Sequence, residues 1–138
     1  MADRLSGPNI EEEYLWSCTL TGAAGEYTWN PEDPADNSED PEDEEFDPSC
    51  KPNHRLLVKT ILLDETAKKD EVTVVQIETT GYKDQKVITP FAKMKSGVDL
   101  QRYLDILVPD AAKFKIISGT GPVTLVGSHC VDFYDYRL

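Results

Sequence analysis

Residues 112–126 read AKFKIISGTGPVTLV, and this stretch does most to decide the fold. Its first part, Ala112–Ile117, alternates apolar residues with lysines, which is typical of a β-strand with one buried face. Gly119 and Gly121 then favour a tight turn, because glycine adopts positive φ angles at little cost. A second apolar run, Val123–Val126, follows at once. The stretch therefore predicts two strands joined by a glycine-rich turn.

Strand signals of the same kind recur along the rest of the chain. The segment Leu100–Val108 would also suit a short helix, because its LxxYLxxL spacing places apolar residues on one helical face. Pro90 predicts an edge strand or a bulge, since proline cannot donate a ladder hydrogen bond. About eight short strands separated by turns predict an all-β antiparallel sandwich or barrel, with a jelly roll among the leading options. The predicted segments are 14–20, 26–29, 56–63, 71–78, 86–94, 100–108, 112–117, 123–126 and 130–134.

Between the second and third predicted strands lies a run of like charge, PEDPADNSEDPEDEEFDP, at residues 31–48. It contains ten carboxylates and no Lys, Arg or His, so the chain's net charge of −12 would be −2 without it. Because the charges repel and little is apolar, residues 31–53 are predicted to form a disordered acidic loop that attracts a polycation. The ten carboxylates are Glu32, Asp33, Asp36, Glu39, Asp40, Glu42, Asp43, Glu44, Glu45 and Asp47.

The length of the chain is that of one domain. Beyond a flexible start at residues 1–13, residues 14–138 are predicted to form a single core domain that carries the acidic loop. No apolar run approaches the ~20 residues that cross a bilayer, and the start has no apolar signal region, so we expect a soluble, intracellular protein without a membrane partner. Cys18, Cys50 and Cys130 are odd in number and widely spaced, which predicts free thiols.

The patterns of a catalytic or cofactor site are missing from the sequence. His54 and His129 are distant and too few for a cupin-type metal centre, and no GxSxG elbow presents a nucleophile. The acidic run lacks the spacing of a calcium loop, and the GTGP turn lacks the Lys-Ser/Thr of a phosphate loop. We therefore expect no enzyme, no metal and no cofactor, with His129 a structural residue beside a turn at Gly127. Repulsion between an acidic chain and phosphate argues against direct nucleic-acid binding.

Four segments resemble parts of the nucleoplasmin/nucleophosmin core domain and follow its order. Gly119–His129, GTGPVTLVGSH, looks like the glycine-proline signature near the end of that domain. Leu15–Leu20 resembles its opening strand, and Ala67–Glu71 resembles its lysine-aspartate-glutamate loop. Lys93-Met94 falls in its leucine-lysine-methionine strand, and the acidic run falls where the family has a variable acidic loop. The resemblance extends from about Tyr14 to Tyr134.

The resemblance implies a jelly-roll subunit that assembles into a pentameric ring, with two rings able to stack into a decamer. It implies a nuclear histone chaperone without catalysis, although the acidic tail and nuclear localisation signal of longer members are not among these residues. The ten carboxylates would bind core histones, and Lys69, Asp70 and Glu71 would contact a facing ring across a two-fold axis. The alternative is a lectin-type jelly-roll binding module whose acidic loop only adds solubility.

Overall fold

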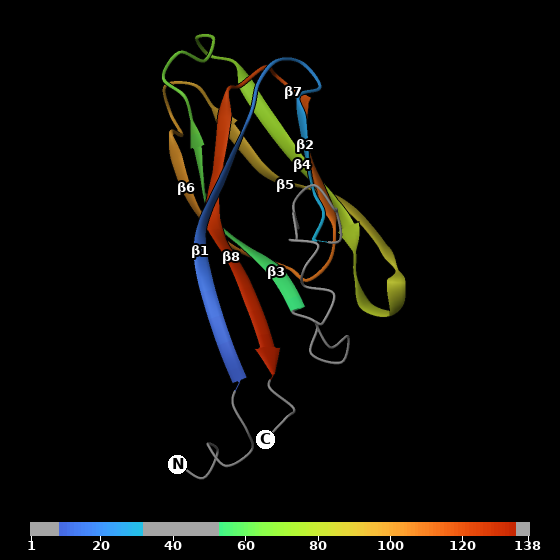
Figure 1. Cartoon of the computed structure of the whole chain (residues 1–138). Helices are drawn as coiled ribbons and strands as arrows, with labels where there is room; N and C mark the ends of the chain where they lie inside the picture. Colours follow the sequence, from blue (N-terminus) through green and yellow to red (C-terminus); the bar gives the residue numbers. More distant parts are fainter. Residues whose placement is uncertain (1–8, 32–52, 135–138) are drawn as a thin grey trace, which may run out of the picture.

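The computed structural model describes residues 9–31 and 53–134, which form eight β-strands in two antiparallel sheets (Figure 1). A short 3₁₀ segment, η4 (Tyr82–Asp84), joins β4 to β5. Within these two ranges, no helix has the length and apolar character needed to cross a membrane. The strands are β1 (Asn9–Leu20), β2 (Glu26–Trp29), β3 (Asn53–Leu63), β4 (Val72–Thr80), β5 (Lys86–Lys95), β6 (Gln101–Val108), β7 (Ala112–Ser118) and β8 (Val123–Tyr134).

The order of the strands is that of a jelly roll. One sheet runs β1-β8-β3-β6 and the other runs β2-β7-β4-β5. Every connection crosses from one sheet to the other except the β4–β5 hairpin, so most neighbouring strands are far apart in the sequence. The predicted eight-stranded antiparallel jelly-roll sandwich is confirmed.

The hydrophobic core lies between the sheets and follows from alternation along each strand. In β7, Ala112, Phe114 and Ile116 are buried, and the lysines between them are only half-buried. Trp16 of β1 and Phe91 of β5 each place their ring centroid 6.1 Å from that of Phe114. Burying a side chain of this size contributes about 1.5–3 kcal/mol. The contact of Trp16 with Phe114 therefore helps to hold the two sheets together, whereas Phe91 and Phe114 pack side by side within one sheet.

Several strands are longer than the sequence predicted, β1 and β8 most of all. β1 begins at Asn9 rather than Tyr14, because residues 9–13 pair with β8 and are therefore not part of a flexible start. β8 is one continuous strand where two separate runs were predicted, so Gly127 lies inside a strand and not in a turn. A side chain at Gly127 would collide with the backbone carbonyl of Leu57 in β3. Glycine at this position therefore permits the close approach of β8 and β3.

Two ambiguous segments are resolved by strand pairing. Residues 101–108 form β6, which pairs with β3 at the edge of its sheet, so the short helix is wrong. Pro90 lies in β5, which pairs only with β4 and is therefore also an edge strand. The register shifts between Val75 and Gln76 of β4, leaving Phe91 as an extra residue on β5. Both parts of the Pro90 prediction, the edge position and the bulge, are confirmed.

The connections gather at two ends of the sandwich (Figure 1). We call one the tied end, and it is made of residues 21–25, 64–71, 96–100 and 119–122. We call the other the open end, and it carries Asn9, Pro31, Asn53 and Tyr134 together with the connections 81–85 and 109–111.

Hydrogen bonds link all four connections of the tied end. The Gly22 amide donates to the Thr120 carbonyl at 2.8 Å, and the Ser96 amide donates to the Glu71 carbonyl at 3.0 Å. The Glu71 carboxylate accepts from the Thr120 amide at 3.1 Å and from the Thr120 hydroxyl at 2.8 Å. These bonds satisfy backbone N–H and C=O groups that have no partner in the strand pairing, and they join the four connections into one unit.

Candidate functional site

The open end carries the segment predicted to bind histones. All ten of its carboxylates, between Glu32 and Asp47, lie outside the described residues. On one side of the segment, Trp29 ends β2 and is only 4% exposed, and Pro31 is buried. On the other side, β3 begins at Asn53. The acidic segment therefore connects a strand of one sheet to a strand of the other at the open end.

Two histidines meet beside these flanking residues. His54 Nδ1 and His129 Nε2 are 2.9 Å apart, and the His129 ring meets Trp29 edge-on with centroids 5.7 Å apart. A hydrogen bond between imidazoles needs one N–H donor and one lone-pair acceptor, so at least one of the two rings is neutral while the bond lasts. The sequence predicted that these two histidines are distant from each other, and this prediction is wrong, because their rings are in contact. The two histidines are 75 positions apart in the sequence, and they come into contact because β3 pairs with β8.

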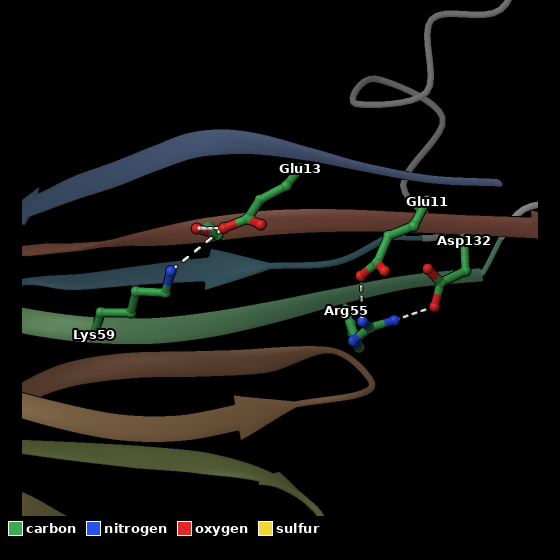
Figure 2. Close-up of polar contacts among 6 residues, drawn as sticks. Glu11, Glu13, Arg55, Lys59 and Asp132 are labelled. Atoms are coloured by element: carbon green, nitrogen blue, oxygen red, sulfur yellow. Dashed lines mark hydrogen bonds and ion pairs between the residues drawn. The ribbon is translucent and has the colours of Figure 1, made fainter.

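A charged network covers the outer face of β1, β8 and β3 (Figure 2). Arg55 of β3 forms ion pairs with Asp132 of β8 and Glu11 of β1, and its Nη2 lies 2.8 Å from Glu11 Oε2. The hydrogen bond to Asp132 raises the pKa of the Arg55 guanidinium. One cation therefore joins three strands of the sheet, and its charge is balanced within the chain.

A second part of this network centres on Glu13 of β1 (Figure 2). The Ser128 hydroxyl donates to Glu13 Oε2 at 2.6 Å, and Lys59 Nζ lies 3.3 Å from the same oxygen. The hydrogen bond from Ser128, with a further contribution from Lys59, lowers the pKa of the Glu13 carboxyl. Glu13 is therefore an ionised and already paired carboxylate at neutral pH.

The tied end carries the three residues predicted to contact a facing ring. Lys69 and Asp70 are exposed, and Glu71 is half-buried. Asp70 has a φ of +61°, in the left-handed region that aspartate tolerates better than most residues. The Glu71 carboxylate is already bonded to Thr120 within its own chain. Lys69 and Asp70 are therefore available to contact a partner, whereas Glu71 stabilises the tied end of its own chain.

The described cysteines are unreactive thiols. Cys18 and Cys130 are both free, and Cys50 lies outside the described residues. Burial raises the pKa of Cys18 to about 12 and also raises the pKa of Cys130. Both thiols are therefore protonated at neutral pH, and a protonated thiol is a poor nucleophile and metal ligand. Over residues 9–31 and 53–134, no group of three or more His, Cys, Asp or Glu side chains could hold a metal ion.

The whole folded domain matches one family of known proteins. The nucleoplasmin/nucleophosmin domain matches residues 13–133. The chain belongs to the nucleoplasmin/nucleophosmin family. It is 32% identical over 126 residues to the mitotic apparatus protein p62 of Lytechinus pictus, covering 91% of this chain and 29% of that protein. It is 32% identical over 127 residues to the nucleoplasmin-like protein ANO39 of Patiria pectinifera, covering 89% of this chain and 34% of that protein.

A solved nucleoplasmin-like structure shares the fold. The crystal structure of the Drosophila NLP core, which provides insight into pentamer formation and histone binding, matches with a TM-score of 0.59 and 27% identity. The match covers 83% of this chain and 97% of that chain. The nucleoplasmin segment Gly119–His129 begins at the tied end and continues into β8, and φ is +84° at Gly119 and +66° at Gly121. The positive φ angles predicted for these two glycines are confirmed.

Proposed function

We propose that this chain is the core of a histone chaperone, which binds basic core histones and stores or delivers them for chromatin assembly in the nucleus. The observation that carries the proposal is membership of the nucleoplasmin/nucleophosmin family over residues 13–133. The Drosophila NLP core, with its link to pentamer formation and histone binding, supports it. The chain spans about a third of the length of the two relatives named above, so the proposal concerns this domain. The proposed role is binding, without catalysis, a cofactor or direct contact with nucleic acid.

The ten carboxylates between β2 and β3 are the proposed histone-binding groups. Histones bind DNA through Lys and Arg, and a dense array of carboxylates competes with phosphate for the same side chains. Each exposed ion pair contributes about 0–1 kcal/mol, so affinity depends on how many form together. Binding of this kind weakens as salt screens the charges, which allows the histone to be released.

The charges of the folded sheet support the same assignment. Glu11, Glu13 and Asp132 are already paired with Arg55 and Lys59. A histone would have to displace those cations before it could bind the three carboxylates. The acidic segment contains no Lys, Arg or His, so its carboxylates have no cation of their own segment to displace. The segment is therefore the better binding site for a polycation.

The proposed functional unit is a homopentamer, and two pentamers stack through their tied ends. The Drosophila neighbour supports a ring of five. Stacking is supported by Lys69 and Asp70, which are exposed on an end that hydrogen bonds hold together. A two-fold contact lets Lys69 of one ring meet an acidic residue of the facing ring and receive the same contact in return.

The histone-binding proposal is tested by removing charge in matched sets. Replacing all ten carboxylates with Asn or Gln should weaken binding of core histones by at least about tenfold, or 1.4 kcal/mol, at about 0.15 M salt. The salt dependence of the remaining affinity should become shallower, because fewer ion pairs are screened. The unfolding free energy should stay within about 0.5 kcal/mol, as expected for changes outside the core.

A smaller pair of variants separates position from total charge. The triple variant E42Q/D43N/E44Q removes three charges from the acidic segment, and E26Q/E65Q/D84N removes three from exposed sites on the folded part. The first should weaken histone binding more than the second. If the two triple variants weaken histone binding equally, the acidic segment is only a solubilising loop. The same conclusion follows if the ten-carboxylate variant keeps the affinity and the salt dependence of the wild type. Glycan binding without histone binding would favour the lectin-type module instead.

A further inference from the structure

We infer that the acidic segment, Glu32–Asp47, docks on lysines of the outer face of the β2-β7-β4-β5 sheet of its own chain. The inference concerns the regulation of the proposed histone-binding site, so its consequence for histones rests on the proposed function. It is carried by the charge of this face, by the ion pairing of its lysines, and by the place where the acidic segment leaves the sheet.

The two sheets of the sandwich carry opposite net charge. The strands β1, β8, β3 and β6 contain five acidic residues and three of Lys or Arg. The strands β2, β7, β4 and β5 contain two glutamates and five lysines, although the whole chain has a net charge of −12. The lysines are Lys86, Lys93, Lys95, Lys113 and Lys115. The second sheet is therefore a basic surface on an acidic protein, and such a surface attracts a polyanion.

Alternation along the strands turns four of these lysines away from the core. In β7, Lys113 and Lys115 alternate with buried residues, and in β5 Lys93 and Lys95 do the same. Lys93 and Lys95 are exposed, and the two lysines of β7 are half-buried. The four ammonium groups therefore belong to the outer face of one sheet, where solvent or a partner can reach them.

These four lysines also lack the ion pairs that balance the charges of the other sheet. Lys86 is paired, because its Nζ lies 3.1 Å from Glu78 Oε2. Glu26 lies opposite Lys115 in the strand register, but no ion pair joins them. Within residues 9–31 and 53–134, none of the four lysines has an ion-pair partner. Arg55 and Lys59 of the other sheet, in contrast, are both paired with carboxylates.

The acidic segment leaves the sandwich beside this face. Thr28 of β2 lies opposite Lys113 of β7, and Pro31 follows three residues later. A hollow of about 210 Å³ at the same end is lined by side chains that include Thr28, Lys86 and Lys113. Half of the residues 32–52, about ten, extend at most ~36 Å, whereas four strands are only ~14 Å across. The segment is therefore long enough to cover the lysines of β7 and β5 while both of its ends stay attached.

Attachment to the same chain favours this segment over a separate polyanion, because a tethered ligand has a high effective concentration. Four lysines cannot neutralise ten carboxylates, so most of the carboxylates stay available to a histone. A basic protein has to displace the lysines from the remaining carboxylates. Weakly basic proteins should therefore bind less well than histones, and the lysine face should increase selectivity for strongly basic partners.

The test measures how fast each lysine reacts with an amine-acylating reagent, with mass spectrometry as the readout. The four lysines should react about two- to fivefold more slowly in wild-type protein than in the ten-carboxylate variant, because a paired ammonium group is less available. Lys68 is the control within the same molecule, since it is exposed at the tied end and should react equally in both proteins. The difference should disappear at about 1 M salt, which screens exposed ion pairs.

A second measurement uses wild-type protein alone and identifies which chain supplies the carboxylates. Carbodiimide coupling should link the acidic segment to Lys113 or Lys115 within one chain, in a refolded mixture of isotopically labelled and unlabelled chains. Equal reactivity of the four lysines in wild type and the ten-carboxylate variant would overturn the inference, and so would links that only join different chains. Protection of these lysines by a DNA duplex, and not by the segment, would assign the face to nucleic acid instead. Protected lysines in a protein that binds no histone would support the docking and overturn only the proposed function.

Discussion

The two ends of the sandwich are built from opposite kinds of sequence. At the tied end, four short connections are joined by bonds among Gly22, Glu71, Ser96 and Thr120. At the open end, the connection between β2 and β3 contains ten carboxylates and five prolines, a composition that favours neither packing nor regular structure. The hydrogen bonds between connections that stabilise the fold are therefore at the tied end, and the charge proposed to bind histones is at the open end. Changes at the two ends should therefore affect different properties.

The largest loss of stability is expected when the tied end is forced apart. A Cβ at Gly119 would lie 2.6 Å from the Val72 carbonyl oxygen and 2.8 Å from the Thr73 Cα, and φ at Gly119 is +84°. Gly119→Ala should therefore lower the unfolding free energy by about 2–5 kcal/mol through backbone strain and overpacking. Gly97 is the control, because its φ is +85° and no described atom lies within 4 Å of its Cβ position. Gly97→Ala should cost about 1–2 kcal/mol in chemical denaturation, and equal losses would rule out the steric explanation.

An intermediate effect is expected from Glu71, which bonds across the tied end. Glu71→Ala removes both hydrogen bonds to Thr120 and should lower the unfolding free energy by about 1.5–3 kcal/mol. Lys69→Glu, two residues away and exposed, should change it by less than about 0.5 kcal/mol. In sedimentation experiments, however, Lys69→Glu should separate stacked rings into single rings. Stacked rings that survive this charge reversal would count against Lys69 as the ring contact.

The smallest effect is expected on the outer face of β1, where Glu13 is exposed and paired. Its lowered pKa means that folding favours the ionised carboxyl, so the stabilisation is fully present above the ordinary carboxyl pKa of 4.5. The stabilisation is lost as the pH falls through the lower pKa of the folded state. Glu13→Gln should therefore be less stable than wild type at neutral pH, and the gap should close as the pH falls below 4.5 and through the lower pKa of the folded state. A gap that stays constant with pH in thermal unfolding would show that the ionisation of Glu13 is irrelevant.

Alternation predicted most strands but could not predict where β1 begins. Ala112–Ile117 alternates cleanly, and β7 differs from it by one residue. Residues 11–13 are three glutamates, which carry no strand signal of their own. They extend β1 because β8 pairs with them and because Arg55 and Lys59 of β3 offset their charge. That compensation depends on strands brought together only by the fold.

The same reason limits what the sequence could say about the candidate site. The composition of Glu32–Asp47 predicts a polycation-binding segment without any knowledge of the fold, and that prediction awaits the charge-removal experiment. The contact between His54 and His129 depends on the pairing of β3 with β8, so their separation along the chain gave no hint of it. The bonds of Glu71 to Thr120 likewise join two connections that only the jelly-roll order brings together.

The position of the four attachment points at the open end has a consequence for how a ring would hold its ligand. Asn9, Pro31, Asn53 and Tyr134 lie at that end, so the segments outside the described residues all join the sandwich there (Figure 1). In the proposed ring, five acidic segments would then be attached along one rim. A histone that leaves one segment meets another at high effective concentration before it diffuses away. Retention of the histone would depend on the spacing of the five acidic segments around the rim as well as on the strength of any one ion pair.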